Sequence, residues 1–212
     1  MVFVGCGPGA ADLLTLRAVR AIAGADVVVW GRPLLPEAVV REHARPGAEV
    51  VAWPPATMQD VLAVYARARD EGLVVARLKS GDPGHLGEMA EELAAVRELG
   101  LPHEVVPGVT AAAAAGAAVG IELATPGRPL LHLAAADAAA RPEPALAVYG
   151  AGHDPAAVVA GLRARGVAGD AACLVAIGIG WPDEAVVGAR LDEVEEVVAD
   201  LGRGSLAIVV VR

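Results

Sequence analysis

Short apolar runs alternate with amphipathic segments through the first 120 residues of the chain. Apolar runs of strand length occupy residues 2–4, 25–30, 49–52, 73–76 and 104–106. The segments between them have helical patterns: in residues 57–69, apolar side chains recur at Met58, Val61, Leu62 and Tyr65, the spacing of one helix face. Strands that alternate with helices are typical of a parallel sheet. The pattern predicts an α/β fold with a mainly parallel N-terminal sheet.

A second α/β unit follows a stretch rich in turn-forming residues. Residues 125–129 (Thr-Pro-Gly-Arg-Pro) have the composition of a linker, so we expect an N-terminal domain over residues 1–124 and a C-terminal domain over residues 125–212. Strand patterns then occupy residues 130–133, 145–149, 172–177, 185–190 and 206–211, and helical patterns occupy residues 154–165 and 191–201. The short turn at residues 180–184 joins two strands that must pair antiparallel, so we expect a mixed C-terminal sheet.

The first strand leads into a glycine-rich loop at residues 5–9 (Gly-Cys-Gly-Pro-Gly), and then into a helix that we expect Asp12 to cap. This order of elements is that of dinucleotide-binding folds. However, the glycines stand at alternate positions instead of following G-x-G-x-x-G, and Pro8 lacks the N–H that a pyrophosphate would use. We therefore interpret the loop as one that lets a ligand approach the backbone closely, and not as a dinucleotide site.

A second candidate site is the turn at residues 81–83 (Gly-Asp-Pro), which follows an apolar run and precedes a helix expected over residues 87–99. In an open α/β sheet, ligands bind at the carboxyl ends of strands, where this turn is expected to lie. Gly81 lets backbone approach a ligand, Asp82 offers a carboxylate, and Pro83 makes the turn rigid. The alternative is that these residues form only a turn, because Gly, Asp and Pro are common in turns.

Composition argues against several classes of function. The 212 residues are 55% hydrophobic but only 3% aromatic, which predicts a core of small side chains. The net charge is −9 and Lys79 is the only lysine, without a basic stripe or an aromatic platform, so we expect no nucleic-acid binding. No apolar run reaches the roughly 18 residues of a membrane span and no signal-peptide pattern is present, so we expect a cytoplasmic protein without membrane contact.

The cysteines and histidines point to neither a disulfide nor a metal. Cys6 and Cys173 are the only cysteines, and both stand in apolar surroundings, which suits a reducing compartment and no disulfide. The five histidines show no metal-ligand spacing, so we expect no metal site.

Four loops at expected strand ends stand out together: residues 5–9, 80–83, 107–111 and 180–184. In this order and spacing the chain resembles the tetrapyrrole methylases, which use S-adenosylmethionine to methylate the macrocycle on the way to cobalamin and sirohaem. The first loop and the Leu-Leu-Thr-Leu that follows it are similar to the family's V-G-x-G-P-G-x-x-x-L-L-T-L opening. Residues 81–83 match its G-D-P, and residues 104–110 match its E-V-V-P-G-[VI]-[ST]. The resemblance covers nearly the whole chain.

Within the family, residues 181–184 (Trp-Pro-Asp-Glu) and 30–36 resemble segments of the precorrin-4 C(11)-methyltransferases. Gly31 stands where uroporphyrinogen-III methyltransferases carry an aspartate proposed as a proton acceptor, which counts against that group. The arginine-rich, substrate-facing segment of the precorrin-4 group is missing from residues 132–139. Donor binding is therefore better preserved in the sequence than tetrapyrrole binding.

The resemblance implies a two-domain fold with the methyl-donor site in the cleft between the domains, and a homodimer. It also places eight residues at positions that contact the donor: Pro8, Gly81, Asp82, His85, Thr110, Ala111, Gly150 and Gly178. Asp82 and Thr110 have an alternative role, since each can cap the helix that follows it. Methyl transfer from a sulfonium needs an in-line approach that proximity and orientation can provide, so we assign no catalytic side chain.

We therefore expect a methyltransferase that uses S-adenosylmethionine and acts on a tetrapyrrole precursor in cobalamin (porphyrin-type) biosynthesis. One alternative is the same fold and donor with a different substrate. Another is a non-catalytic paralogue that binds the donor or a partner. A chain that binds the donor but turns over no precorrin would separate the first hypothesis from the other two.

Overall fold

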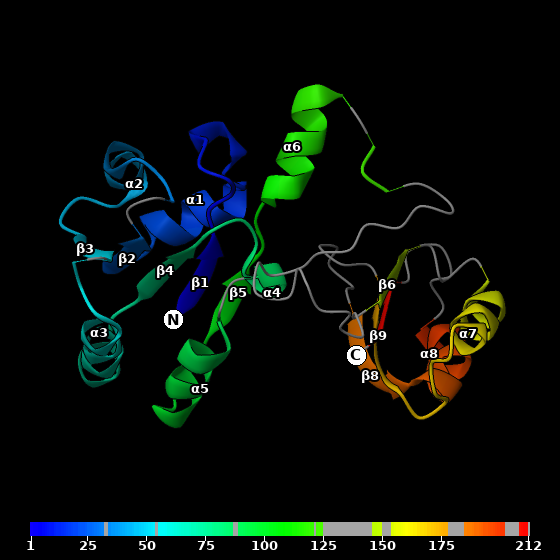
Figure 1. Ribbon diagram of the computed structural model, residues 1–212. Coiled ribbons are helices and arrows are strands. Elements are labelled where there is room, and N and C mark those ends of the chain that lie inside the picture. Colours follow the sequence, from blue (N-terminus) through cyan, green and yellow to red (C-terminus); the bar gives the residue numbers. More distant parts are fainter. Residues whose placement is uncertain are drawn as a thin grey trace. The chain divides into compact units, whose positions relative to one another are not determined.

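The computed structural model describes residues 1–31, 34–53, 55–86, 89–120, 122–124, 146–149, 154–177, 185–201 and 208–211. The chain divides into two compact units, Met1–Ala134 and Ala135–Arg212 (Figure 1). The domain boundary that we expect after residue 124 is followed by residues outside the described ranges, and it stays a prediction.

The first unit alternates strands and helices as the apolar pattern predicts. Its strands are β1 (Val2–Gly5), β2 (Val27–Gly31), β3 (Glu49–Trp53), β4 (Val75–Lys79) and β5 (Glu104–Val106). Its helices are α1 (Leu16–Ala23), α2 (Glu37–His43), α3 (Met58–Glu71), α4 (Pro83–Leu86), α5 (Ala90–Glu98) and α6 (Ala111–Val119), with a 3-10 turn at Ala11–Leu13. The described strands pair in the order β3-β2-β4-β1-β5, and every pair is parallel, which confirms the parallel N-terminal sheet.

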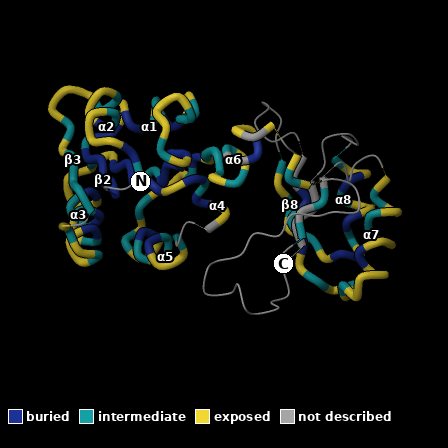
Figure 2. Tube along the Cα trace, turned by 45° about the horizontal axis from the view of Figure 1, so that its top comes forward, coloured by how far each residue is buried: buried dark blue, intermediate teal, exposed yellow. Residues whose placement is uncertain are grey.

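Helices cover both faces of this sheet. On one face, Val4, Val28 and Leu78 of the strands pack in a core with residues of α1 and α2. On the other face, alternate strand residues such as Phe3 and Val29 pack in a core with residues of α3 and α5. In Figure 2 the buried residues of this unit lie mainly on the strands, and most exposed residues lie on the helices and turns that flank them. Burial on both faces explains why these strands read as continuous apolar runs.

Two helix starts can be compared with the sequence pattern. Thr57 caps α3 as part of a capping box, in which its hydroxyl accepts from the Asp60 amide at 3.2 Å. Helix α1 is capped by Thr15, whose hydroxyl accepts from the Ala18 amide at 3.1 Å, so the expected cap by Asp12 is wrong. Asp12 instead lies in a 3-10 turn that delays the helix.

The helix expected over residues 87–99 is present as α5 (Ala90–Glu98), and a separate short helix that was not expected, α4 (Pro83–Leu86), precedes it. Helix α4 begins at Pro83, inside the Gly-Asp-Pro segment itself. Proline suits the first position of a helix because the N–H that it lacks has no partner there. The Gly-Asp-Pro segment therefore connects the end of β4 to the start of α4 and contributes its proline to the helix.

The second unit is a sheet with helices on one face. Its described elements are β6 (Leu146–Tyr149), α7 (Pro155–Ala164), β7 (Ala172–Ile177), β8 (Ala185–Arg190), α8 (Val194–Leu201) and β9 (Ile208–Val211), with a 3-10 turn at Leu191–Glu193. Val159 and Leu162 of α7 and Val194 and Val198 of α8 form one core with Val175 of the sheet. On β8 the residues alternate between half-buried and exposed, as expected of a strand with one covered face.

The described strands of this second sheet pair only antiparallel, in the order β6-β9-β7-β8. The parallel pairs of the mixed sheet that we expect are not found among them. Strands β6 and β7, which α7 connects, do run in the same direction, but β9 lies between them and runs the opposite way. Strands β8 and β9 are likewise separated by β7. The expected strand at residues 130–133 lies outside the described residues.

Candidate functional site

The loops after β1, β4 and β5 lie at the carboxyl edge of the first sheet. From β1 the chain continues to β2, beyond β4, whereas from β4 it continues to β5, beyond β1. The neighbouring strands β1 and β4 are therefore the place where the connections change direction. In open α/β sheets, ligands bind in the crevice at the carboxyl ends of such a strand pair.

Backbone hydrogen bonds join the first two of these loops. The Cys6 amide donates to the Lys79 carbonyl at 2.9 Å. Gly7 and Gly81 then exchange two hydrogen bonds, of 2.9 and 3.3 Å, as an isolated antiparallel bridge beyond the parallel strands. Gly81 has φ +57°, a conformation that favours glycine.

Three glycines bring the backbones of the three loops into contact, and we call Gly5, Gly81 and Gly108 the glycine junction. A Cβ at Gly108 would lie 2.1 Å from the Gly81 carbonyl oxygen, and a Cβ at Gly5 would lie 2.6 Å from the Gly108 nitrogen. Both distances are far below van der Waals contact and both involve backbone atoms. The junction can therefore close only where positions 5 and 108 have no side chain, whereas position 81 favours glycine because of its positive φ.

Asp82 ties the junction together from one side. Its Oδ2 accepts from the Gly108 amide at 3.0 Å, which links the loop after β4 to the loop after β5. Its Oδ1 accepts from the Gly84 amide at 2.7 Å, at the start of α4. Both carboxylate oxygens thus accept hydrogen bonds from backbone amides. The bond from Gly84 shows that Asp82 caps the helix that follows it, which was one of its two possible roles. Donor contact by the same carboxylate stays a prediction.

Six of the eight predicted donor-contact residues come together at this edge. Pro8 is exposed in the first loop, Gly81 and Asp82 form the second, and His85 is half-exposed on α4, with its Nδ1 3.6 Å from Asp82 Oδ1. Thr110 and Ala111 begin α6, where the Thr110 hydroxyl caps the helix by accepting from the Ala113 amide at 3.2 Å. The remaining two, Gly150 and Gly178, and the Trp-Pro-Asp-Glu segment at residues 181–184, lie outside the described residues.

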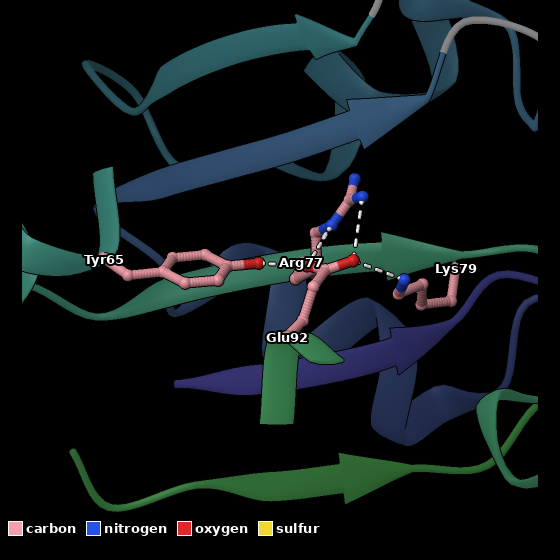
Figure 3. Close-up of polar contacts among 4 residues, drawn as sticks. All are labelled: Tyr65, Arg77, Lys79 and Glu92. Atoms are coloured by element: carbon pink, nitrogen blue, oxygen red, sulfur yellow. Dashed lines mark hydrogen bonds and ion pairs between the residues drawn. The ribbon is translucent and has the colours of Figure 1, made fainter. Parts of the chain in front are cut away.

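A buried polar cluster below the second loop is absent from the sequence predictions. Arg77 and Lys79 point from β4 to the Glu92 carboxylate of α5, and Tyr65 of α3 donates to the same carboxylate (Figure 3). Arg77 and Glu92 are each 1% exposed and Lys79 is 8% exposed. The alternation of charged residues at 77 and 79 within an apolar run was a usable signal, but nothing nearby in the sequence marks Glu92 as their partner.

Arg77 binds Glu92 in a fork, with Nε 2.9 Å from Oε2 and Nη2 3.1 Å from Oε1, while its guanidinium lies 4.9 Å from the Trp53 ring centre. Lys79 Nζ adds a contact of 2.5 Å to Oε1. Burial raises the pKa of Glu92, but the hydrogen bonds and charge of Arg77 and the hydrogen bonds of Lys79 and Tyr65 outweigh it and hold the pKa below its usual range. Burial, together with the charge of Glu92, raises the pKa of Tyr65. The cluster therefore holds an ionised carboxylate under the site.

The Cys6 thiol, which lies at the same strand end, is expected to be unreactive. It is buried and its Sγ donates to the Lys79 carbonyl at 2.9 Å. Burial raises the pKa of Cys6 to about 11, against a smaller lowering by a backbone hydrogen bond. Because the thiolate is the reactive form, we expect iodoacetamide at pH 8 to leave Cys6 unmodified in the native protein and to modify it after denaturation. Peptide mass spectrometry distinguishes it from Cys173, and rapid native labelling of Cys6 would contradict the burial.

Two kinds of feature are absent from the described part of the chain. No group of three or more His, Cys, Asp or Glu side chains there is arranged to hold a metal ion. In the same ranges, no helix combines the length and the apolar character needed to cross a membrane.

Comparison with known proteins gives a consistent set of relatives. The chain is 40% identical over 124 residues to a precorrin-4 C(11)-methyltransferase of Pseudomonas aeruginosa, covering 58% of this chain and 49% of that protein. It is 33% identical over 211 residues to the enzyme of that name from a Sinorhizobium species, covering 93% and 83% of the two chains. The crystal structure of uroporphyrin-III-C-methyltransferase from Thermus thermophilus matches with a TM-score of 0.56 and 33% identity, covering 99% of this chain and 90% of that one.

The match spans about half the length of several of the curated relatives. The model of one protein family covers a much larger share of the chain: it matches residues 1–195, which include all three loops of the glycine junction. The chain therefore belongs to the tetrapyrrole (corrin/porphyrin) methylases.

Proposed function

We propose that this chain is an S-adenosylmethionine-dependent methyltransferase that methylates a carbon of a tetrapyrrole precursor in cobalamin biosynthesis, as a precorrin-4 C(11)-methyltransferase does. The observation that carries the proposal is the glycine junction, which lies at the switch point of a parallel sheet in a chain that matches the family over residues 1–195. Relatives of that name at 33–40% identity support the choice of reaction.

The residues at this edge suit a ligand that comes close to the main chain. Gly7 and Gly81 present backbone without side chains, and both have positive φ. When bound, S-adenosylmethionine supplies a methyl group from its sulfonium. The chain's part is to hold donor and acceptor carbon in line, and such positioning can lower a barrier by about 7–11 kcal/mol. This chemistry requires no nucleophilic side chain, and we assign none.

The end of β2 favours precorrin-4 over uroporphyrinogen III as the substrate class. Gly31 is the last residue of β2 and is buried. A Cβ there would lie 3.1 Å from Leu34 Cδ1, so a carboxylate side chain at this position would require Leu34 to move. The chain thus offers no proton acceptor where the uroporphyrinogen-III enzymes that it resembles carry an aspartate. The homodimer implied by the resemblance and the cytoplasmic location expected from the sequence belong to the same proposal.

Calorimetric titration with S-adenosylmethionine and S-adenosylhomocysteine tests the proposal. We expect micromolar binding by the wild type, about −8 kcal/mol. Asp82→Asn should weaken it about tenfold, because the new NH₂ group faces one of the two amides that the carboxylate now accepts from, and one loop loses its anchor. Asp70→Asn, an exposed carboxylate paired with Arg69, is the matched control and should bind as the wild type does.

Turnover decides the substrate. Transfer of labelled methyl from the donor to precorrin-4, with little transfer to uroporphyrinogen III, is the expected result. Donor binding without transfer to either would favour a different substrate or a non-catalytic paralogue. The absence of donor binding by calorimetry and by thermal shift would overturn the methyltransferase proposal.

A further inference from the structure

Lys79 connects three parts of the candidate site. Its carbonyl oxygen accepts from both the amide and the thiol of Cys6, each at 2.9 Å, and so holds the loop after β1. Its ammonium group contacts Glu92 Oε1 at 2.5 Å, and so holds α5. Lys79 is also the last residue of β4, two positions before Gly81. One residue therefore fixes the start of the segment that leads to the glycine junction, and through Glu92 it fixes the helix after that segment.

The chemistry at this position is particular to lysine. The chain has 17 basic residues, and Lys79 is the only lysine among them. Arg77 already occupies the carboxylate of Glu92 with its planar fork. A compact ammonium group on a flexible stem can reach the remaining side of one oxygen, whereas a second guanidinium would need a second planar approach. Arg77 and Lys79 share the single carboxylate of Glu92, so the cluster carries one excess positive charge, and each cation depends on its contact with Glu92 for stabilisation.

We propose that Lys79 is a positioning residue for the Gly-Asp-Pro segment, because its ion pair with Glu92 ties α5 to the end of β4 and so holds residues 80–86 in the conformation that closes the glycine junction. Tyr65 contacts the same carboxylate from the opposite end of the cluster, away from this segment (Figure 3). Tyr65 stabilises the cluster, and Lys79 also sets the geometry of the site. The effect on donor binding rests on the proposed function; the effect on the segment itself does not.

The test compares Lys79→Met with Tyr65→Phe, each of which removes one contact to Glu92 without removing the side chain's bulk. Hydrogen exchange measured by mass spectrometry reports on the amides of residues 80–86. We expect these amides to exchange about tenfold faster in Lys79→Met, since the lost contact is a charge-assisted one, and within about twofold of the wild type in Tyr65→Phe. The dissociation constant of S-adenosylhomocysteine should rise by about the same factor in Lys79→Met alone.

The two readouts separate this inference from the proposed function. If residues 80–86 exchange at the wild-type rate in Lys79→Met, or equally fast in both variants, the positioning role is overturned whatever the donor does. If exchange differs as expected but the wild type binds no donor, the positioning role stands and the methyltransferase proposal fails. Thermal melting of both variants shows whether general destabilisation alone explains the exchange.

A second measurement works even where Lys79→Met does not fold. Because Lys79 is the only lysine, wild-type protein labelled with ¹⁵N-lysine gives a single backbone amide signal, from the end of β4. Glu92→Gln should shift this signal, and Glu91→Gln, one residue away and exposed, should leave it in place. An unmoved signal in Glu92→Gln would show that the ion pair does not set the backbone at Lys79.

Discussion

Replacing Glu92 by alanine should lower the free energy of unfolding of the first unit by about 3–5 kcal/mol, the usual cost of breaking a buried ion pair from one side. Arg77 and Lys79 would then be left as two buried cations without a counter-charge, and the Tyr65 hydroxyl would lose its acceptor. Denaturant unfolding at pH 7 measures the loss. Glu91→Ala makes the same chemical change on the exposed side of α5 and should leave stability within about 0.5 kcal/mol.

The pH dependence of this loss follows from the lowered pKa of Glu92. In the unfolded chain the carboxyl titrates near 4.5, and in the folded protein it titrates below that value. Its contribution to stability is therefore complete above pH 4.5 and is lost as the pH falls through the folded pKa. The difference between wild type and Glu92→Ala should be largest near neutral pH and should shrink in acid. A difference that stays constant below pH 4.5 would contradict an ionised, stabilising Glu92.

Gly108→Ala should have an effect of similar size for a steric reason. The new Cβ would meet the Gly81 carbonyl oxygen at 2.1 Å and Gly5 Cα at 2.9 Å, and none of these backbone atoms can turn away. The loop after β5 would have to move, breaking the hydrogen bond from the Gly108 amide to Asp82. We expect a loss of about 3 kcal/mol or more in unfolding free energy, at the upper end for overpacking, together with loss of donor binding.

Two other glycine substitutions test this explanation, one inside the glycine junction and one outside it as a control. Gly5→Ala meets the same junction from β1, with its Cβ 2.6 Å from the Gly108 nitrogen, and should behave like Gly108→Ala. Gly161→Ala lies in α7, where a Cβ meets nothing within 4 Å, and should be neutral or stabilising because alanine favours helix. Wild-type stability in both junction variants would mean that the three loops do not touch as described.

Local pattern was sufficient for most strands and helices of the first unit. The apolar runs marked β1, β2 and β3, and Gly81 and Asp82 were identified because turn residues followed a strand. Pattern failed where two nearby residues compete for one role, as Asp12 and Thr15 do at the start of α1. It failed again where the partner is distant: Glu92 reads as one of two acidic residues in the first turn of a surface helix until β4 places Arg77 and Lys79 beside it.

The glycine junction shows the same limit. Gly5 and Gly108 are 103 positions apart, and each is an ordinary glycine at a strand end when read alone. Only the parallel pairing of β5 and β4 with β1 brings their backbones into contact. For Asp82 the sequence left two roles open, donor contact and helix capping. The local bond from the Gly84 amide shows the capping role, and long-range pairing adds a bond that was not predicted, from the Gly108 amide to the second carboxylate oxygen.

The place of β9 has a consequence for the order in which the chain can fold during synthesis. The five described strands of the first sheet all lie before residue 107, so they can pair while the ribosome is still translating the rest. In the second sheet, β6 has no described neighbour other than β9, and β7 needs β9 on one side. Until residues 208–211 have emerged, β6 lacks the one strand with which it pairs in the described part of the chain, and β7 exposes the edge that β9 will cover. Uncovered strand edges favour pairing with other chains, so the second unit is expected to be more prone to aggregate during synthesis than the first.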